Sequence, residues 1–293
     1  MTAQRMTTGE ERAAAAADLF AEAAAGQTVE LAVLSGLERC SLGGPAQALF
    51  ETVVADAWLK LGDKHRAQAL DQATAGLIER GLLIDDKPEG PNFPAYSMAP
   101  ELGLAMAARS RPTYVVTTEV VGRPVRCLQF FAVGDVEVPV RGGVVEEPIA
   151  LPPGAGVRPN LKKMGPLGWF TRYRLVSQET AAGILADVAI VGRPGDDGPL
   201  PYAVSRFKHH EGQAVTEAGM VVVGDGTTAR VRWLRAGMDS GTVSVFDPGE
   251  ERDVVTPAPT APHPGESADP DVAILDVDGL RAAARRLLES GSW

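Results

Sequence analysis

Apolar residues recur at helical spacing in the first part of the chain. Residues 9–25 and 45–60 are rich in alanine and leucine, and their spacing predicts two helices. Pro45 follows a glycine pair and suits the first turn of the second helix, because proline lacks an amide hydrogen that this position leaves unbonded. Gly62 is expected to stop that helix.

A third helix is predicted in DKHRAQALDQATAGLIERGLL, with Asp63 as its N-cap and Gly81 as its exit. Its apolar face is expected to hold Ala67, Leu70, Ala73, Leu77 and Ile78. A shorter helix, APELGLAMAARS, ends before Pro112. Residues 1–110 are therefore predicted to be mainly helical.

After Pro112 the sequence takes on the character of strands. The runs TYVVTTEVV, RPVRCLQFFAVGD and VEVPVRGG are β-branched and aromatic, and glycines 122 and 134 mark turns between them. Residues 111–145 are therefore predicted to form a three-stranded antiparallel meander. Residues 146–175 are rich in proline and glycine, and we expect them to be a connection.

Residues 176–246 repeat this order of a helix followed by strands. LVSQETAAGILADVAIV predicts a helix capped by Ser177, although Thr180 stands where a capping box needs glutamate or glutamine. A second meander of four strands follows, with turn residues at 211–212, 224–226 and 239–241; its strands are YAVSRFKHH, AVTEAGMVVVGD, TARVRWLRAG and TVSVFDP.

The end of the chain is predicted to hold an acidic flexible loop, residues 247–276, and a closing helix, residues 277–293. Asp278 is the expected N-cap of this helix. Its apolar face is expected to dock on the second sheet through Leu280, Ala284, Leu287 and Leu288. The predicted fold class is α+β, with two helix-plus-antiparallel-meander halves and a closing C-terminal helix.

Negative charge is concentrated in one segment. The net charge is −10, and residues 247–278 hold nine carboxylates against one arginine, which leaves the rest of the chain close to neutral. An acidic protein repels nucleic acid, so the overall charge disfavours that partner. No apolar run of about eighteen residues occurs and the N-terminus lacks a signal-peptide pattern, so we expect a cytoplasmic protein without membrane insertion.

The segment FKHHEGQAVTEAG raises the question of a metal site. His209 and His210 are adjacent, and adjacent residues on a strand point to opposite faces, so both cannot bind one ion without a bulge. Strong zinc spacings such as HExxH or paired CxxC are absent. We therefore predict a solvated hairpin end around Glu211, with no metal and no cofactor.

No catalytic nucleophile stands out in the sequence. Ser35 and Ser110 lack the glycines of a GxSxG elbow. Cys40 and Cys127 each follow an arginine, which favours a thiolate at an exposed site, but free cysteines are usually buried and we expect two core thiols. The protein is therefore predicted not to be an enzyme.

The helical region also fits a winged-helix module, which gives the alternative function of a DNA-binding transcriptional regulator with a C-terminal sensor or dimerisation domain. LLIDD and AYSM suit a wing, and the helix before them takes the place of a recognition helix. Its candidate DNA-binding residues are Lys64, Arg66 and Arg80. Asp71 and Glu79 nearly cancel their charge, which weakens contacts with phosphate.

The order of several segments resembles a known family. ALDQATAGLIERGLLIDD, APELGLAMAARS, the first meander, and the later run from YAVSRFKHH to VSVFDPG with the closing helix DGLRAAARRLLESGSW resemble EspG-type proteins of type VII (ESX) secretion. The resemblance covers residues 65–133 and 200–293. It implies an α+β fold with a pseudo-two-fold pair of halves, and a non-catalytic cytosolic chaperone or adaptor for a helical secretion substrate of PE/PPE or WXG type.

A partner helix of this kind needs an exposed apolar groove with a polar rim. The candidate partner-binding residues lie on the second meander and its hairpin; they are His209, His210, Glu211, Met220 and Trp233. For Met220 and Trp233 the alternative is the ordinary core of the sheet, because both residue types are commonly buried.

Overall fold

The computed structural model describes residues 9–43, 52–85, 96–121, 126–134, 142–149, 161–191, 201–210, 213–224, 226–235 and 272–290. The chain divides into two compact units, and each unit is built from two stretches of chain. Unit 1 holds Met1–Pro112 and Val144–Val176, and unit 2 holds Thr113–Gly143 and Ser177–Trp293. Both units combine helices with antiparallel strand pairs, so the predicted α+β class is confirmed.

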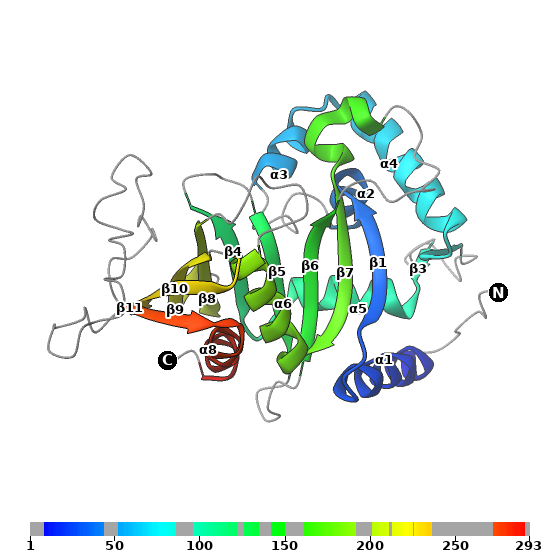
Figure 1. Ribbon diagram of the computed structural model, residues 1–293. Coiled ribbons are helices and arrows are strands. Elements are labelled where there is room, and N and C mark those ends of the chain that lie inside the picture. The colour runs from blue at the N-terminus through cyan, green and yellow to red at the C-terminus, as the bar shows by residue number, and fades with distance from the viewer. Residues whose placement is uncertain are drawn as a thin grey trace, which may run out of the picture. The chain divides into compact units, whose positions relative to one another are not determined.

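Unit 1 contains most of the predicted helices, and they are labelled in Figure 1. Its first part runs α1 (Gly9–Ala24), β1 (Val29–Ser35), α2 (Gly36–Gly43), α3 (Thr52–Leu59), α4 (Asp63–Glu79), β2 (Leu83–Asp85), β3 (Tyr96–Met98) and α5 (Pro100–Ser110). Its second part runs β6 (Gly142–Ile149), the 3₁₀ segment η2 (Leu161–Gly168) and β7 (Phe170–Ser177). Strands β1, β7 and β6 form one sheet in that order, and β2 pairs with β3 in a small antiparallel sheet.

Helices α2, α3 and α4 pack together with η2 around an apolar cluster in unit 1. The buried members of this cluster are Leu37, Cys40, Val54, Trp58, Ala69, Ala73 and Leu167. Ala69, Ala73 and Leu77 recur every four residues, which places all three on one face of α4. Ala67 and Leu70 were predicted on this face but are exposed. The buried residues of α4 occupy a narrower part of the helix surface than the predicted apolar face, which included these two residues.

The ends of α4 differ in how well the sequence predicted them. Gly81 is the exit, with a φ of 69°, and its amide and that of Leu82 donate to the carbonyls of Ile78 and Leu77. The predicted N-cap was wrong by one residue: Gly62 is the cap, and Asp63 is the first helical residue. Asp63 instead accepts a hydrogen bond from Arg66 one turn later.

Three strands of unit 1 were not predicted where they lie. β1 falls in a stretch for which no element was predicted, and β7 falls at the end of the expected connection. They pair antiparallel from Val29↔Leu175 to Ser35↔Phe170. β6 begins at Gly142, near the end of the third predicted strand, whose earlier residues 136–141 lie outside the described part of the chain.

In its described residues, unit 2 holds six neighbouring antiparallel strands and two helices. Its elements are β4 (Val115–Val120), β5 (Arg126–Val133), α6 (Gln178–Val191), β8 (Pro201–His210), β9 (Gln213–Gly224), β10 (Thr228–Arg235), β11 (Val272–Asp276) and α8 (Val277–Ser290). The strand order is β5-β4-β8-β9-β10-β11. Strand β4 pairs with β8, for example Val116↔Arg206, so the two predicted meanders belong to one sheet and not to separate halves.

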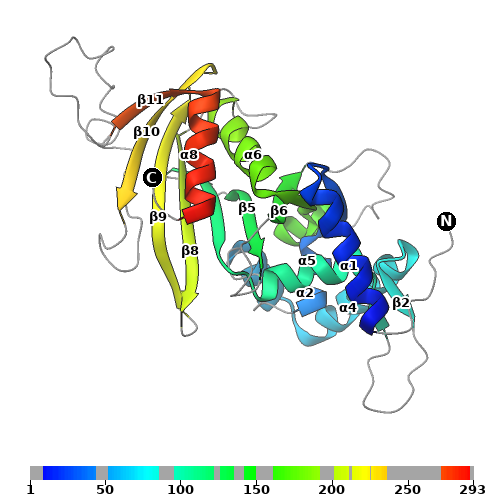
Figure 2. The ribbon, with the colours of Figure 1, turned by 90° about the horizontal axis from the view of Figure 1, so that it is seen from below.

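The two described helices of unit 2, α6 and α8, cover the same face of this sheet, as Figure 2 shows for strands β8 to β10. Ser177 caps α6 as predicted, because its hydroxyl accepts the amide hydrogen of Thr180 at 3.1 Å. Gly224 on β9 lies against the end of α6, where a Cβ atom would stand 2.6 Å from the carbonyl oxygens of Ala189 and Ile190. Close packing of helix on strand therefore requires glycine at this position.

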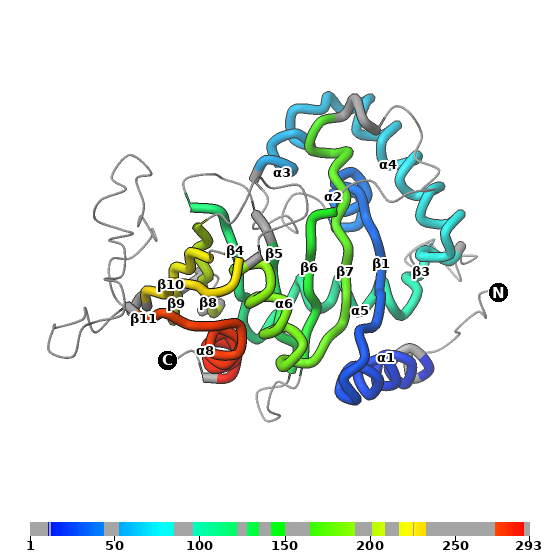
Figure 3. The backbone as a smooth tube through the Cα atoms, viewed as in Figure 1, coloured from blue at the N-terminus to red at the C-terminus, as the bar shows by residue number. Residues whose placement is uncertain are grey.

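The last strand and helix differ from the sequence prediction at their junction. Residues 272–276 were predicted as part of a flexible loop but form β11, which pairs antiparallel with β10. The backbone trace in Figure 3 leads from β11 directly into α8. Asp276 caps α8, since its Oδ1 accepts the amide hydrogen of Gly279 at 2.7 Å, whereas the predicted cap, Asp278, pairs with Arg281.

The apolar face of α8 matches its prediction. Leu280, Ala284, Leu287 and Leu288 are all buried, and the helix contacts α6, β10 and β11. The predicted strand TVSVFDP and residues 236–271 as a whole lie outside the described part of the chain.

Candidate functional site

The predicted hairpin at the end of β8 is confirmed. His209 pairs with Ala214 and His210 with Gln213, and residues 211–212 connect the two strands. Only the backbone of the two histidines is described, and Glu211 lies outside the described residues. Within the described ranges, no group of three His, Cys, Asp or Glu side chains is placed to hold a metal ion.

Met220 and Trp233 lie directly opposite each other on β9 and β10. Met220 also pairs with Val204, which lies six positions before His210 on β8, so the pair is well separated from the hairpin end. The Met220 side chain is 1% exposed, and its neighbours Val204 and Val222 are equally buried. It is a core residue beneath the helices, so Met220 is not part of an exposed partner-binding surface; the side chain of Trp233 is not described.

The two faces of the sheet in unit 2 differ in what covers them. Alternate residues of β8, β9 and β10 are buried under α6 and α8, and these are Tyr202, Val204, Met220, Val222, Ala229 and Val231. Their neighbours along each strand point to the other face. Neither described helix of unit 2 covers that face, which we call the open face (Figure 2).

The open face carries apolar residues with Glu119, Arg230 and Arg232 among them, and it is not exposed throughout, since Ser205 and Val221 on this face are only 5% and 3% exposed. One row across it runs from Glu119 on β4 through Ala203 and Val221 to Arg232 on β10. The next row runs from Pro201 through Val223 and Arg230 to Ile274 on β11. Ile274 is 49% exposed and adds apolar area beside Arg230, although Leu59 and Trp169 in unit 1 are more exposed.

Arg230 and Arg232 are the basic groups of the open face. They are two residues apart on β10, so their side chains stand on the same face about 6.8 Å apart along the strand. No hydrogen bond or ion pair joins either guanidinium to another described residue. Both are half-buried, so their aliphatic stems cover neighbouring apolar surface of the sheet.

On the covered face, Arg206 holds the end of α8 to the sheet. Its Nη1 donates to the carbonyl oxygens of Leu287 at 2.8 Å and Leu288 at 2.6 Å, and its Nε donates to Glu217 at 2.8 Å. Its guanidinium carbon lies 3.7 Å from the centre of the Tyr114 ring. Because the last carbonyls of a helix have no partner within the helix, this contact satisfies two of them.

Tyr114 links this cluster to α6. Its hydroxyl accepts a hydrogen bond from Gln178, the first residue of α6, at 2.8 Å. Burial raises the pKa of the Tyr114 hydroxyl, while the hydrogen bond from Gln178 and the charge of Arg206 act in the opposite direction. On the covered face, Arg206 and Tyr114 thus connect the sheet to the end of α8 and the start of α6. The open face is therefore the candidate contact surface of unit 2.

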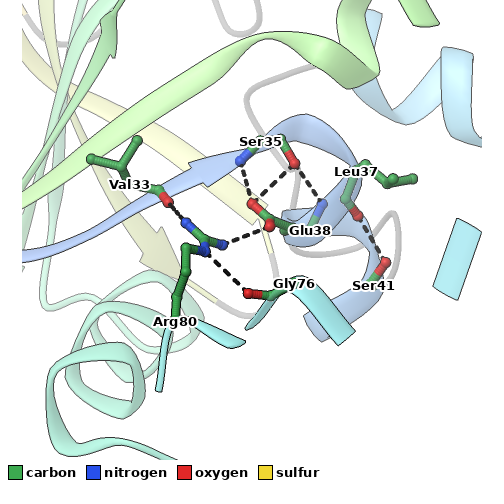
Figure 4. Close-up of polar contacts among 7 residues, drawn as sticks. All are labelled: Val33, Ser35, Leu37, Glu38, Ser41, Gly76 and Arg80. Carbon is green, nitrogen blue, oxygen red and sulfur yellow. Dashed lines mark hydrogen bonds and ion pairs between the residues drawn. The ribbon is translucent and has the colours of Figure 1, made fainter. Parts of the chain in front are cut away.

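The candidate DNA-binding residues lie on or beside α4 in unit 1. Lys64 is exposed, and Arg66 pairs with Asp63 at 2.6 Å. Arg80 is engaged within the unit, as Figure 4 shows: it donates to the carbonyls of Gly76 and Val33 and to Glu38 Oε1 at 2.6 Å. The predicted wing is present as the antiparallel pair β2 and β3.

Ser35 and Glu38 form a capping box at the start of α2 (Figure 4). The amide of Glu38 donates to the Ser35 hydroxyl at 3.2 Å, and the amide of Ser35 donates to Glu38 Oε2 at 2.8 Å. The other serine weighed as a nucleophile, Ser110, donates its hydroxyl to the carbonyl of Met106. Both serines therefore have structural hydrogen bonds.

Cys40 is buried in unit 1 beside charged groups. Burial raises the pKa of its thiol, although Arg39 and Arg109 act to lower it. Arg109 on α5 pairs with Glu146 on β6, with 2.9 Å between Nε and Oε1, and both side chains are buried. The thiol of Cys40 is buried and protonated, which matches its predicted role as a core residue. The side chain of Cys127 is not described.

Comparisons of the chain with models of protein families, with curated proteins and with solved structures find no match. Among the described helices, none is both long enough and apolar enough to cross a membrane. The fold and the surfaces described above are therefore the basis for assigning a function.

Sequence inspection missed the open face because the predicted site was centred on the hairpin. A signal was present: TARVRW alternates apolar and basic residues, which places Arg230 and Arg232 on one face of a strand. The position of Ile274 had no such signal, because its strand was predicted to be part of the acidic loop.

Proposed function

We propose that this protein is a non-catalytic adaptor or chaperone that holds a helical protein partner against the open face of unit 2. The observation that carries the proposal is the exposed Ile274 beside Arg230 and Arg232, on the sheet face that neither described helix of unit 2 covers. A helix with an apolar stripe packs naturally on an apolar sheet face, as α6 and α8 do on the opposite side.

The class of partner comes from the sequence. The order of segments resembles EspG-type proteins, and this resemblance implies a helical type VII secretion substrate of PE/PPE or WXG type. Among the described residues, Ser35 and Ser110 make structural hydrogen bonds and Cys40 is buried. None of the three is arranged as a catalytic nucleophile, which supports a non-catalytic role. A cytoplasmic protein-binding role is consistent with both.

The alternative is a winged-helix DNA-binding regulator, which the pairing of β2 with β3 after α4 favours. The charge of α4 opposes it, since with Arg80 it carries three acidic and three basic side chains. Two of the three candidate cations, Arg66 and Arg80, already bind acceptors within unit 1. Phosphate binding needs an excess of available cations, so we rank this alternative second.

The proposal is tested by capturing the partner. Tagged full-length protein is used to pull down its partners from the cytosol of its own source cell, with washes at moderate salt and identification by mass spectrometry. We expect a small helical protein of WXG or PPE type in near-equal amount. Recovery of DNA that is lost at high salt supports the winged-helix alternative instead, because phosphate contacts weaken steeply with salt. Recovery of neither contradicts both.

A further inference from the structure

The two arginines of the open face indicate the chemistry of the partner. Arg206 and Arg281 of unit 2 each pair with a carboxylate, Glu217 and Asp278. Arg230 and Arg232 have none among the described residues, although both are half-buried. A half-buried guanidinium gains most from a carboxylate, which it can bind through two parallel hydrogen bonds.

We propose that the partner helix presents two carboxylates at positions i and i+4, one for Arg230 and one for Arg232, beside an apolar side chain that contacts Ile274. This inference rests on the proposed adaptor function and specifies its partner. Residues i and i+4 of a helix are about 6 Å apart along its axis. Residues two apart on a strand are separated by about 6.8 Å, so a helix lying along β10 matches both arginines.

The apolar contact follows from the register of the sheet. Arg230 lies between Val223 on β9 and Ile274 on β11, and directly opposed residues of neighbouring strands share a face. A helix above β10 therefore has Ile274 on one side of its axis and Val223 on the other. This arrangement fits a helix whose two acidic residues lie at the centre of its contact face, with apolar residues on either side of them.

A strand added at the outer edge of β11, the last strand of the described sheet, fits the charges less well. Such a strand would lie one strand beyond β11, and therefore two strands from Arg230 and Arg232. Its nearest charged neighbour on the open face would be Asp276, which is exposed opposite Thr228 and repels carboxylates. The geometry favours a helix on the face over a strand at the edge.

The test uses two designed helical peptides of identical length and leucine stripe. One carries glutamates at i and i+4, and the other carries lysines at the same positions. Binding of each labelled peptide to the full-length chain is measured by fluorescence anisotropy. The variants are R230E/R232E and, as a control with the same change in charge, K60E/R111E, whose two side chains are exposed in unit 1.

We expect the glutamate peptide to bind the wild-type chain roughly tenfold more tightly than the lysine peptide, because close charge pairs at interfaces couple strongly. The preference should reverse in R230E/R232E and remain in K60E/R111E. Reversal also shows that the double variant is folded. Loss of the preference in K60E/R111E, equal binding of both peptides to the wild-type chain, or no binding of either, overturns the proposal.

Three further outcomes separate this inference from the adaptor function and from a competing occupant. If the pull-down yields a helical partner that R230E/R232E retains at wild-type level, the function stands and the inference fails. If no partner is recovered but the peptide preference reverses, the function fails and the surface chemistry stands. If the glutamate peptide binds only after the carboxylates between residues 247 and 271 are replaced by amides, the chain's own acidic segment is the occupant and the proposal is overturned.

Discussion

At position 206 an arginine is buried on the covered face of unit 2, where it is only 8% exposed. Burying a charge is costly unless hydrogen bonds and an opposite charge compensate for it. Here the compensation comes from two carbonyls of α8, from Glu217 and from the face of the Tyr114 ring. One side chain from the middle of the sheet therefore fixes the end of the last helix.

Replacing Arg206 by methionine should destabilise unit 2 by about 3 kcal/mol, because it leaves the last carbonyls of α8 and the Glu217 carboxylate without their donor. Urea unfolding measures the loss, and hydrogen exchange of α8 should show that it opens locally. The control is Arg111→Met, which changes an exposed arginine at the end of α5 and should cost little. Equal effects of both substitutions would contradict the role of Arg206.

Tyr114 gives unit 2 a dependence on alkaline pH. Its pKa in the folded chain is raised above the ordinary 10.0, chiefly by burial, so the unfolded chain loses this proton first as the pH rises. The stability from the neutral hydroxyl is therefore complete below about pH 10 and is lost as the pH rises through the folded-state pKa. Unfolding free energies measured between neutral and alkaline pH should show a decline above pH 10 that is smaller in Tyr114→Phe.

An identical decline in wild type and Tyr114→Phe would contradict this assignment. The remaining tyrosines titrate in both proteins, so only the difference between the two curves reports on position 114. Tyr114→Phe also loses the hydrogen bond from Gln178, but that loss shifts the whole curve and does not change its slope.

Among the elements, α2 depends on its first turn, where the capping box and the ion pair with Arg80 meet at Glu38. Ser35→Ala should cost about 1 kcal/mol, because the amide of Glu38 loses its acceptor. Glu38→Gln should cost less, since glutamine also completes a capping box and only the half-exposed ion pair is lost. Thermal or urea unfolding of the two variants gives the order, and the reverse order would contradict the assigned roles.

The sequence predicted elements best where the pattern was long and regular. The long helices α1, α4 and α5 and the β8–β9 hairpin lie where their spacing placed them. The caps at Asp63 and Asp278 were wrong because another residue nearby could also cap: Gly62 leads α4, and Asp276 stands two positions earlier at the end of a strand. Which of two neighbouring candidates caps a helix depends on the path of the preceding chain.

Short strands were the weak point. β1 is a run of mostly apolar residues, which periodicity alone does not distinguish from a helical turn. β7 alternates buried Tyr173 and Leu175 with Arg172 and Arg174, which bind Glu147, but this alternation follows directly on the proline- and glycine-rich segment. β11 has only five residues, and the acidic composition around it hid its apolar centre.

At the scale of the whole molecule, the sequence did not predict how the chain divides into its two compact units. Adjacent segments were grouped into halves, whereas residues 144–176 belong with the N-terminal helices and the two meanders share one sheet. Long-range pairing such as Val116↔Arg206 leaves no local pattern. For the same reason the candidate site was placed at the hairpin, and the cross-strand group of Arg230 and Ile274 became visible only with the register.

The most direct test of the adaptor function is hydrogen–deuterium exchange of the full-length protein, free and in the complex recovered by the pull-down. We expect slower exchange on binding in β10 and β11, around residues 228–232 and 272–276, with little change in α4. Protection confined to α4 and the β2–β3 pair, or an unchanged pattern throughout unit 2, would contradict a partner held on the open face.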